Sequence, residues 1–239
     1  MKKKALAGDN ITVSKGMWKF DKKTSVNFDK HVFKSVPLYN EGHKLIADLS
    51  DFFIGNNSVV YDIGCSTGSL IEKILVNNSK KNFKIYGIDN ERSMIDLSKK
   101  RLKKFSQCFF KCGDVTKTSF RKSDLIISYY TIQFIHPKLR QLLINKLYES
   151  LNWGGALIFF EKVRAPDARF QDIMTQLYNE FKIMNGYSKE EILSKTLSLK
   201  GVLEPFSTQG NLDMLKRSGF VDITTISKYI CFEGFLAIK

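Results

Sequence analysis

An acidic residue followed by a glycine-containing turn stands directly after a short apolar segment, as in many ligand-binding loops. Residues 62–68 are Asp-Ile-Gly-Cys-Ser-Thr-Gly. Glycine lets the backbone approach a ligand closely, and a helix that starts here presents free N–H groups. A dinucleotide site would place a second glycine where Cys65-Ser66 stands, so that a pyrophosphate could be cradled. The carboxylate of Asp62 would repel a pyrophosphate and attract a cation, so this turn, with Gly64 and Gly68, favours a cationic ligand.

Two further acidic residues follow the next predicted strands. Asp89 ends the apolar segment 83–89 and is followed by Asn90, and Asp114 stands in Gly-Asp-Val after a third apolar segment. A carboxylate at the position of Asp89 can accept both hydroxyls of a ribose, and the position of Asp114 and Val115 suits an adenine amino group. The alternative is that both carboxylates only cap helices. A ribose and adenine site without a phosphate cradle indicates S-adenosylmethionine.

Alternating strands and helices are predicted to bring these residues together. Apolar segments typical of strands alternate with segments whose apolar residues recur at helical spacing, as in residues 70–75. This alternation predicts an α/β protein with a Rossmann-like, seven-stranded, mostly parallel sheet and helices on both faces. The predicted strands are 58–64, 83–89, 108–110, 124–129, 156–161, 221–225 and 231–238. Ligands of such sheets bind beyond the carboxyl ends of the strands, where the acidic residues stand.

The regular alternation stops after residue 161. Apolar and aromatic residues from Phe170 to Met184 form one long helical stripe, and residues 188–191 have the pattern of a capping box that starts another helix. We therefore expect a helical lid insertion at about residues 163–208 that covers the strand ends. Residues 1–45 are expected to form an N-terminal helical arm, and residues 46–239 the ligand-binding domain.

The composition is that of a folded and strongly basic protein. The chain has 239 residues, of which 43% are hydrophobic, and this excludes a disordered or collagen-like chain. No signal-peptide core follows the basic start, and no apolar run reaches the ~20 residues of a membrane helix. The four cysteines match neither a disulfide framework nor a metal site. We therefore expect a cytoplasmic protein with no metal and no membrane partner.

The net charge of +14 comes mainly from lysine, which favours a solvated surface and leaves RNA or a carboxylate substrate open as anionic partners.

The motifs taken together resemble those of a known family. A strand followed by Asp-x-Gly-x-x-x-Gly, then Gly-Ile-Asp-Asn and Gly-Asp-Val, resembles the class I S-adenosylmethionine-dependent methyltransferases. Six blocks in order narrow the resemblance to the carboxy-S-adenosylmethionine synthases of bacterial tRNA wobble-uridine modification. These blocks are residues 35–39, 60–66, 87–90, 131–134, 161–162 and 181–188. The similarity extends from about residue 20 to residue 239.

This resemblance implies a homodimer with the methyltransferase fold. It also implies that prephenate is used to convert S-adenosylmethionine into its carboxylated sulfonium, with release of phenylpyruvate. By the same resemblance, Tyr39 touches the cofactor, residues 64–66 contact its amino-acid end, Asp89 binds the ribose, and Asp114 and Val115 bind the adenine. The complete expected cofactor site is Tyr39, Asp62, Gly64, Cys65, Ser66, Gly68, Asp89, Asn90, Asp114, Val115 and Tyr129.

Two departures from the family bear on the reaction. Tyr129 stands where the family has an asparagine near the end of the fourth strand. The family also has Lys-Arg after its Asn-Gly-Tyr-Ser block and uses the arginine to hold the extra carboxylate, whereas this chain has Lys195-Thr196. A threonine hydroxyl cannot replace the two-pronged pairing of a guanidinium with a carboxylate. The sequence by itself therefore favours in-line methyl transfer to a small-molecule acceptor, with S-adenosylhomocysteine as the product.

Two alternatives stay open. The first is the carboxylated-cofactor synthase, with Lys195 or another lysine in the place of the arginine. The second is a non-catalytic relative that binds the cofactor or RNA, which the basic charge motivates. Tyr130 and His136 are weak candidates for acid–base work, and we assign no catalytic base. Tyr178, Lys195 and Thr196 are the candidates for substrate contacts from the lid.

Overall fold

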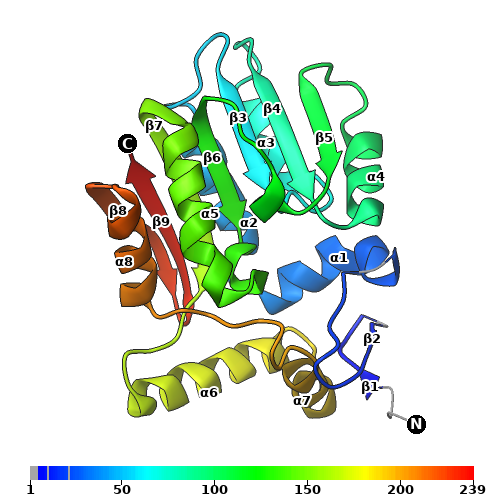
Figure 1. Ribbon diagram of the computed structural model, residues 1–239. Helices are drawn as coiled ribbons and strands as arrows, with labels where there is room; N and C mark the ends of the chain where they lie inside the picture. The colour runs from blue at the N-terminus through cyan, green and yellow to red at the C-terminus, as the bar shows by residue number, and fades with distance from the viewer. Residues whose placement is uncertain (1–4, 10, 21) are drawn as a thin grey trace.

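The computed structural model describes residues 5–9, 11–20 and 22–239, and its centre is one seven-stranded sheet (Figure 1). The strands lie in the order β5-β4-β3-β6-β7-β9-β8. The first five strands in this order are parallel to one another, and β9 runs antiparallel to both of its neighbours, β7 and β8. Their bounds are β3 Val59–Ile63, β4 Lys84–Asp89, β5 Cys108–Cys112, β6 Ser123–Tyr129, β7 Leu151–Lys162, β8 Asp222–Tyr229 and β9 Phe232–Ile238. This confirms the predicted α/β class and the mostly parallel sheet.

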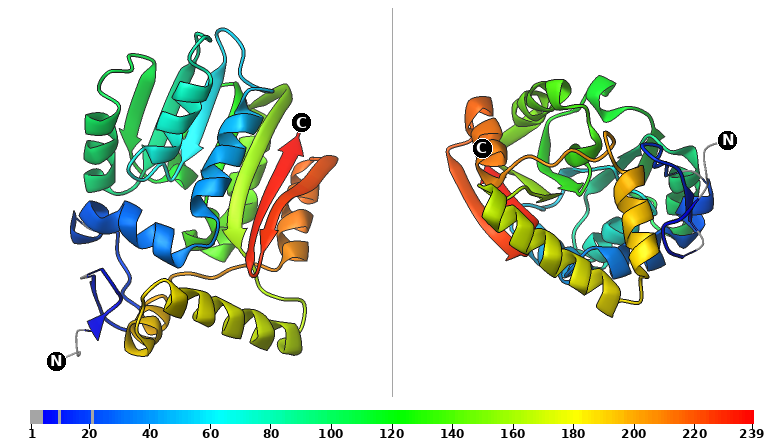
Figure 2. Two further views of the ribbon diagram at one scale, coloured as in Figure 1. Left: turned by 180° about the vertical axis from the view of Figure 1, so that it is seen from behind. Right: turned by 90° about the horizontal axis from the view of Figure 1, so that it is seen from below.

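Helices cover both faces of the sheet (Figure 2). One face packs against α2 (Tyr39–Ser50), α3 (Ser69–Asn77) and α4 (Arg92–Arg101), and the other against α5 (Pro137–Ser150) and α8 (Thr208–Ser218). The predicted stripe on α3 is buried throughout, since Leu70, Ile71, Ile74 and Leu75 all belong to the core. Burial of both faces explains why the central strands are continuously apolar rather than alternating.

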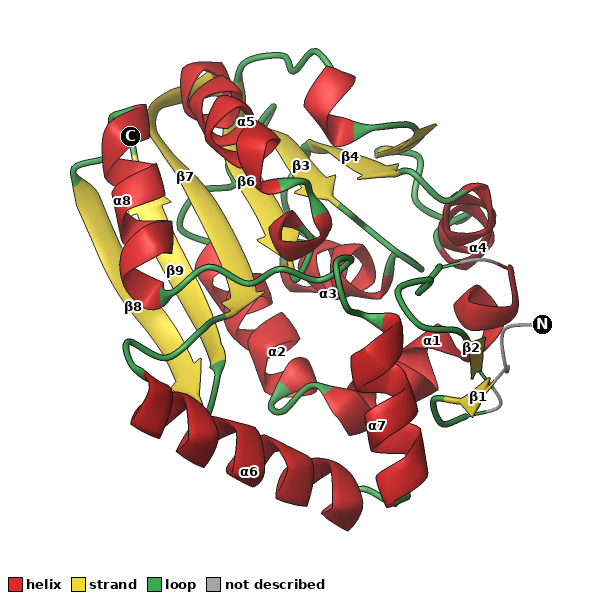
Figure 3. Cartoon of the chain, turned by 60° about the horizontal axis from the view of Figure 1, so that its bottom comes forward, coloured by secondary structure: helices red, strands yellow, loops and turns green. Residues whose placement is uncertain are grey.

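The remaining elements lie beyond the carboxyl ends of the parallel strands (Figure 3). They are the hairpin strands β1 (Ala5–Leu6) and β2 (Thr12–Val13), and the helices α1 (Lys22–Ser35), α6 (Ala168–Met184) and α7 (Lys189–Ser198). Two short 3₁₀ turns, η1 (Val115–Lys117) and η2 (Ile132–Phe134), follow β5 and β6. The segment expected as a lid thus contains α6 and α7. The segment expected as a helical arm contains a small hairpin as well as α1 and the start of α2.

Local signals mark most of the helix starts. Pro137 is the first residue of α5, and Ser188 forms the predicted capping box with Glu191 at the start of α7. One expectation was wrong: the strand predicted at 156–161 starts earlier, since β7 begins at Leu151, immediately after α5, and residues 153–155 lie inside it. The positive φ of Gly154 and its hydrogen bond to the carbonyl of Lys239 allow the strand to bend at this point. In the part of the chain that the structure describes, no helix has the length and apolarity to cross a bilayer.

Candidate active site

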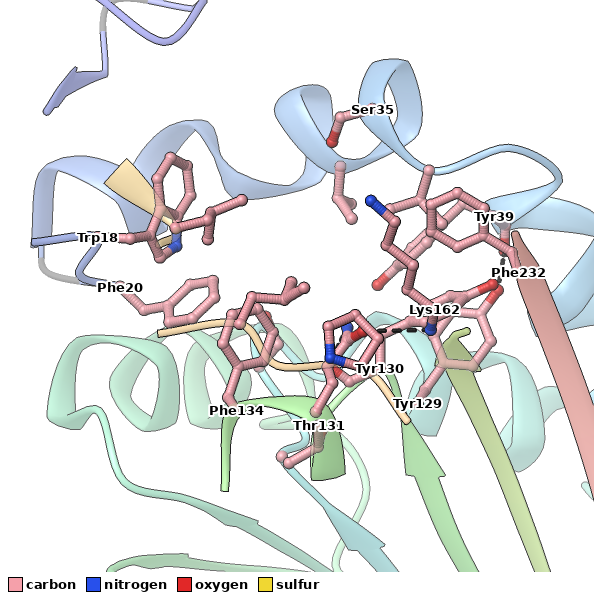
Figure 4. Close-up of a pocket in the computed structure, with 18 of the residues that line it drawn as sticks. Trp18, Phe20, Ser35, Tyr39, Tyr129, Tyr130, Thr131, Phe134, Lys162 and Phe232 are labelled. Atoms are coloured by element: carbon pink, nitrogen blue, oxygen red, sulfur yellow. Dashed lines mark hydrogen bonds between the residues drawn. The ribbon is translucent and has the colours of Figure 1, made fainter. Parts of the chain in front are cut away.

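A cavity of about 680 Å³ opens at the strand ends, and residues of the sheet, α1 and the two lid helices line it. Figure 4 shows part of this lining. That volume falls in the usual range for sites that enclose small ligands. Most of the residues predicted for the site line it together, although they come from many separate segments. They are Tyr39, Asp62, Gly64, Cys65, Ser66, Asp89, Asn90, Asp114, Val115, Tyr129, Tyr130, Tyr178, Lys195 and Thr196. Gly68 and His136 do not line this cavity.

The turn after β3 offers no cradle for a phosphate. The N–H groups of Gly64 and Cys65 both donate to the carbonyl of Ile88, at 2.7 and 3.0 Å, and the N–H of Ser66 donates to Asp89 Oδ2 at 2.9 Å. The donors that would hold a pyrophosphate are therefore already used within the protein. Gly68 has a structural place instead, because it caps α3 with a φ of 75°.

Asp62 presents a buried carboxyl group at the base of the cavity. Asp62 is 1% exposed, and its Oδ1 has no hydrogen-bond partner among the described residues. Burial, and then the nearby charge of Asp89, raise the pKa of Asp62 to about 8. A buried carboxyl without a partner suits a ligand that brings a cationic group, such as the amino-acid end of S-adenosylmethionine.

This raised pKa predicts how ligand affinity depends on pH. In the ligand-free protein the Asp62 carboxyl is protonated below about pH 8, whereas a bound cation favours the ionised form. S-adenosylmethionine should therefore bind more tightly as the pH rises from 6 to 8, with release of up to one proton, as measured by calorimetry in buffers of different ionisation enthalpy. The Asp62→Asn variant should lose that proton release. Unchanged release in the variant would show that another group carries the pH dependence.

Asp89 and Asp114 stand at the ends of neighbouring strands. Asp89 Oδ2 accepts from Ser66 N–H and Oδ1 accepts from Glu91 N–H, both at 2.9 Å. Each oxygen keeps a second lone pair that can accept a ribose hydroxyl. Asp114 caps η1 by accepting from the N–H of Thr116 at 2.9 Å, so the capping alternative describes one part of its role. Both residues also line the cavity, so capping and ligand contact are compatible at these positions.

Three tyrosines form the wall of the cavity beside β6 (Figure 4). The hydroxyl of Tyr129 donates to the carbonyl of Tyr39 at 2.8 Å and lies where a Cβ on Gly42 would stand, so Tyr129 ties α2 to the sheet. Tyr130 has a φ of 60°, a conformation that is rare for a large residue and marks a constrained site. Burial raises the pKa of Tyr130, so its phenol stays protonated and can act as a hydrogen-bond donor but not as a base.

His136, the other weak catalytic candidate, lies away from the cavity. It is exposed and stands at the N-cap of α5, where its Nδ1 accepts from the N–H of Lys138 at 3.3 Å. The proline that follows it starts the helix. The structure therefore gives His136 a capping position rather than a place near the reacting groups.

Three lysines that the sequence did not single out as a group meet at the lid side of the cavity. Lys162 at the end of β7 and Lys182 on α6 both lie over the ring of Tyr178, with Nζ 4.6 and 4.3 Å from its centroid. Lys195 on α7 completes this lysine wall, and all three residues line the cavity. Within the described ranges none of the three forms an ion pair.

The lysine wall has no paired carboxylate among the described residues, and the pKa values of its three lysines are lowered. Burial lowers the pKa of Lys195 to about 7 and that of Lys182 to about 8, and the charges of the neighbouring lysines add to the effect. Burial also lowers the pKa of Lys162. Three crowded cations without a carboxylate form a ready site for an anion. A signal was present in the sequence: Lys182 stands four residues after Tyr178 on the apolar stripe of α6, a position that a structural helix would fill with an apolar residue.

The cavity thus has an acidic end and a basic end. Asp62 and Asp89 lie at its sheet end, where a nucleoside with a cationic sulfonium would fit, and the lysine wall lies at its lid end. In the described part of the chain, no three His, Cys, Asp or Glu side chains are arranged to hold a metal ion.

Comparisons with known proteins show which family the chain belongs to. Residues 60–155 match the family described as "Methyltransferase domain". A carboxy-S-adenosyl-L-methionine synthase of Staphylococcus epidermidis is 39% identical over 228 residues, covering 93% of this chain and 97% of that protein. The enzyme of the same name from Campylobacter lari is 36% identical over 223 residues, covering 93% and 94%.

A solved structure supports the same fold. Human N-acetylserotonin methyltransferase in complex with S-adenosylmethionine superposes with a TM-score of 0.62 at 19% identity, covering 92% of this chain and 56% of that chain. At this identity the likeness concerns the fold alone, which is that of the class I S-adenosylmethionine-dependent methyltransferases. The sequence identities, which extend over nearly the whole chain, show that this protein is a member of the carboxy-S-adenosyl-L-methionine synthase family.

Proposed function

We propose that the protein makes carboxy-S-adenosylmethionine from S-adenosylmethionine and prephenate. The observation that carries the proposal is the lysine wall, which faces the acidic end of the same cavity. S-adenosylmethionine is a cation at its sulfonium and prephenate is a dianion, so the two charges match the two ends. The name of the relatives supports the same reaction. Synthesis of carboxy-S-adenosylmethionine therefore replaces methyl transfer as the leading interpretation. Methyl transfer was the reaction that Thr196 favoured when the sequence was considered alone.

The atoms of this reaction balance without another reactant. One methyl C–H bond of S-adenosylmethionine breaks and a C–C bond to carbon dioxide forms, while prephenate loses its ring carboxylate and its hydroxide as the ring becomes aromatic. The proton and the hydroxide combine to water, and phenylpyruvate remains. No redox partner is needed.

The chain's own residues have distinct tasks in this proposal. Asp89 accepts the ribose hydroxyls and Asp62 pairs with the cationic end of the nucleoside. Lys162, Lys182 and Lys195 bind the carboxylates of prephenate and hold them next to the sulfonium methyl, where proximity does much of the catalytic work. α6 and α7 cover the strand ends and keep water away from the reacting groups.

A labelled substrate tests the proposal directly. The protein should be incubated with prephenate and S-adenosylmethionine whose methyl group carries three deuterium atoms, followed by mass analysis of the nucleosides. The proposal expects a nucleoside that has gained carbon dioxide and kept two deuterium atoms. Recovery of unchanged S-adenosylmethionine under conditions where it binds would contradict the proposal.

Methyl transfer to a small carboxylate-bearing acceptor is the second candidate. Thr196 favours it, because its hydroxyl is neutral and already donates to the carbonyl of Ile192 at 2.9 Å. The lysine wall would then bind the acceptor. The same labelled cofactor separates the two candidates, since methyl transfer yields S-adenosylhomocysteine and an acceptor that carries all three deuterium atoms.

A further inference from the structure

The segment that follows the N-terminal hairpin is hydrogen-bonded to the end of the lid helix α7, and the hairpin turn packs on Tyr187 just before that helix. The N–H groups of Gly16 and Trp18 donate to the carbonyls of Leu197 and Ser198, at 2.9 and 3.1 Å. At the hairpin turn Gly8 has a φ of 89°, and a Cβ on it would lie 2.1 Å from a ring carbon of Tyr187. The turn is therefore shaped to sit on the Tyr187 ring, and this contact brings the next residue, Asp9, inside the protein.

Asp9 is the buried anchor of a polar chain that leads to the cavity. Its side chain is 5% exposed, and it accepts from Lys34 Nζ at 3.0 Å and from His31 Nδ1 at 3.1 Å. Because a carboxylate only accepts, the imidazole of His31 carries its proton on Nδ1, and Nε2 is free to accept. Lys195 Nζ lies 2.7 Å from this Nε2 and donates to it. The hydroxyl of Tyr187 closes the cluster by donating to the backbone carbonyl of His31 at 3.2 Å.

The hydrogen-bonded series from Asp9 through His31 holds Lys195 at the edge of the cavity. His31, Trp18 and Lys195 all line it, and the Trp18 ring stacks on the His31 ring with a centroid distance of 5.7 Å. Lys195 Nζ is 5.4 Å from the centroid of Trp18. An ammonium group has three donors, and His31 takes one of them. The other donors remain for a ligand, and the direction of the side chain is set by the His31 bond.

We propose that Asp9 and His31 are positioning residues that hold the Lys195 ammonium group to bind a carboxylate of the substrate, which makes the N-terminal hairpin part of the substrate site. This inference rests on the proposed function for the identity of the substrate. It goes beyond that function because it assigns a task to a segment far from the strand ends in the sequence.

The charges around Lys195 give the arrangement a pH dependence. The titratable groups that face Lys195 are Asp9 from the hairpin turn, His31 from α1, Tyr187 before α7, Lys182 from α6 and Lys162 from β7. Lys34 from α1 lies behind them, paired with Asp9. Burial and then the Lys195 charge lower the pKa of His31 to about 3, so His31 stays neutral. Burial and the two lysines lower the pKa of Lys195 to about 7, while Asp9 opposes them. A bound carboxylate would favour protonated Lys195, so anion binding should weaken as the pH rises above 7.

Trp18 is a local reporter that can test this without turnover. The chain has two tryptophans, and Trp153 is 90% exposed, so the Trp153→Phe variant leaves Trp18 as the only indole. In this variant, Trp18 emission should titrate near pH 7, and malonate, as a non-reacting dicarboxylate, should move the midpoint upward. Lys195→Met should remove the titration and weaken malonate binding by about tenfold or more, as expected for a charge-assisted hydrogen bond.

Two further variants separate positioning from simple support of the fold. Asp9→Asn keeps a hydrogen-bond acceptor but removes the charge, so the midpoint should move downward and the KM for prephenate should rise severalfold at about pH 8 but not at about pH 6. Lys195→Arg keeps its charge at all these pH values, so the change in malonate binding near pH 7 should disappear, and only the dependence from Lys182 near pH 8 should remain. The control is Asp51→Asn, which removes an exposed carboxylate that pairs with Lys81.

The outcomes are distinct. An unmoved midpoint in Asp9→Asn, or equal malonate binding in Lys195→Met and the parent, would overturn the inference. A rise in the KM of Asp9→Asn that is the same at every pH would show that Asp9 has only a structural role, and this result would also overturn the inference. If the emission changes occur as expected but no carboxylated nucleoside forms, the proposed reaction fails while the anion-binding role of Lys195 stands.

Discussion

Replacing Asp89 by alanine should weaken the binding of S-adenosylmethionine by about 100-fold or more. Each carboxylate oxygen of Asp89 already accepts one backbone N–H and keeps a further lone pair that can accept from a ligand bound in the cavity. Two hydrogen bonds from ribose hydroxyls to a charged acceptor contribute about 1.5–3 kcal/mol each. Their loss therefore corresponds to at least two orders of magnitude in the dissociation constant. Titration calorimetry with S-adenosylmethionine and with S-adenosylhomocysteine measures it.

The controls for this prediction address the fold. Asp89→Asn keeps one acceptor oxygen and should show an intermediate loss, while Asp48→Asn removes an exposed carboxylate that pairs with Lys44 and should bind as the parent does. Thermal melting shows whether the N–H groups of Ser66 and Glu91 tolerate the loss of their acceptor. Binding within tenfold of the parent by a folded Asp89→Ala protein would place the ribose elsewhere.

Replacing Lys182 by methionine should change activity and stability in opposite directions. Lys182 is 4% exposed and forms no ion pair within the described ranges, so its charge destabilises the ligand-free protein. Methionine has a similar length and no charge, and we expect a gain of about 1 kcal/mol in stability, or a few degrees in melting temperature. The KM for prephenate should rise about 10- to 100-fold, because a charge-assisted contact to a carboxylate is lost.

The gain in stability should also depend on pH. Burial lowers the folded-state pKa of Lys182 to about 8, whereas the unfolded value is that of a free lysine. The penalty for burying the charge is therefore complete below about pH 8 and fades as the pH rises above it. The difference in melting temperature between Lys182→Met and the parent should be largest at neutral pH and should shrink in alkaline buffer.

An exposed lysine on the neighbouring helix provides the matched control. Lys189→Met at the start of α7 removes the same charge from the surface and should leave both the melting temperature and the KM near the parent values. A Lys182→Met protein that is more stable and equally active would show that the lysine wall does not bind the substrate. A variant that is less stable would show that the cation–π contact with Tyr178 outweighs the cost of burial.

The acidic end of the cavity was predictable because its signals are local. Asp62, Asp89 and Asp114 each stand at the end of an apolar segment, and parallel strands place their carboxyl ends along one edge. Recognising three strands was enough to predict that these three residues line one cavity. The positions of Gly68 and His136 were less predictable, because a glycine or a histidine beside a helix start serves equally well as a cap and as a ligand contact.

The lid end of the site followed from no local pattern. Lys162, Lys182 and Lys195 belong to β7, α6 and α7, and in the sequence they are three among many lysines. The departure at Thr196 was visible and weakened the expectation of a carboxylate site. The neighbouring lysines that can supply the missing charge could be recognised only after α6 and α7 were placed over the strand ends.

The sequence by itself determined the mostly parallel sheet, the places of its strands along the chain and the acidic edge, because hydrophobic periodicity and strand-end residues act over a few positions of the chain. The order in which the strands lie side by side was seen only in the structure. Only the tertiary structure decided which cations share the cavity and which of them lack a counter-ion. The link from Asp9 through His31 to Lys195 joins residues up to 186 positions apart (195 − 9 = 186). Charges interact through space and over a few ångströms, so their partners, their pKa values and the ligand they can bind depend on how distant segments pack together.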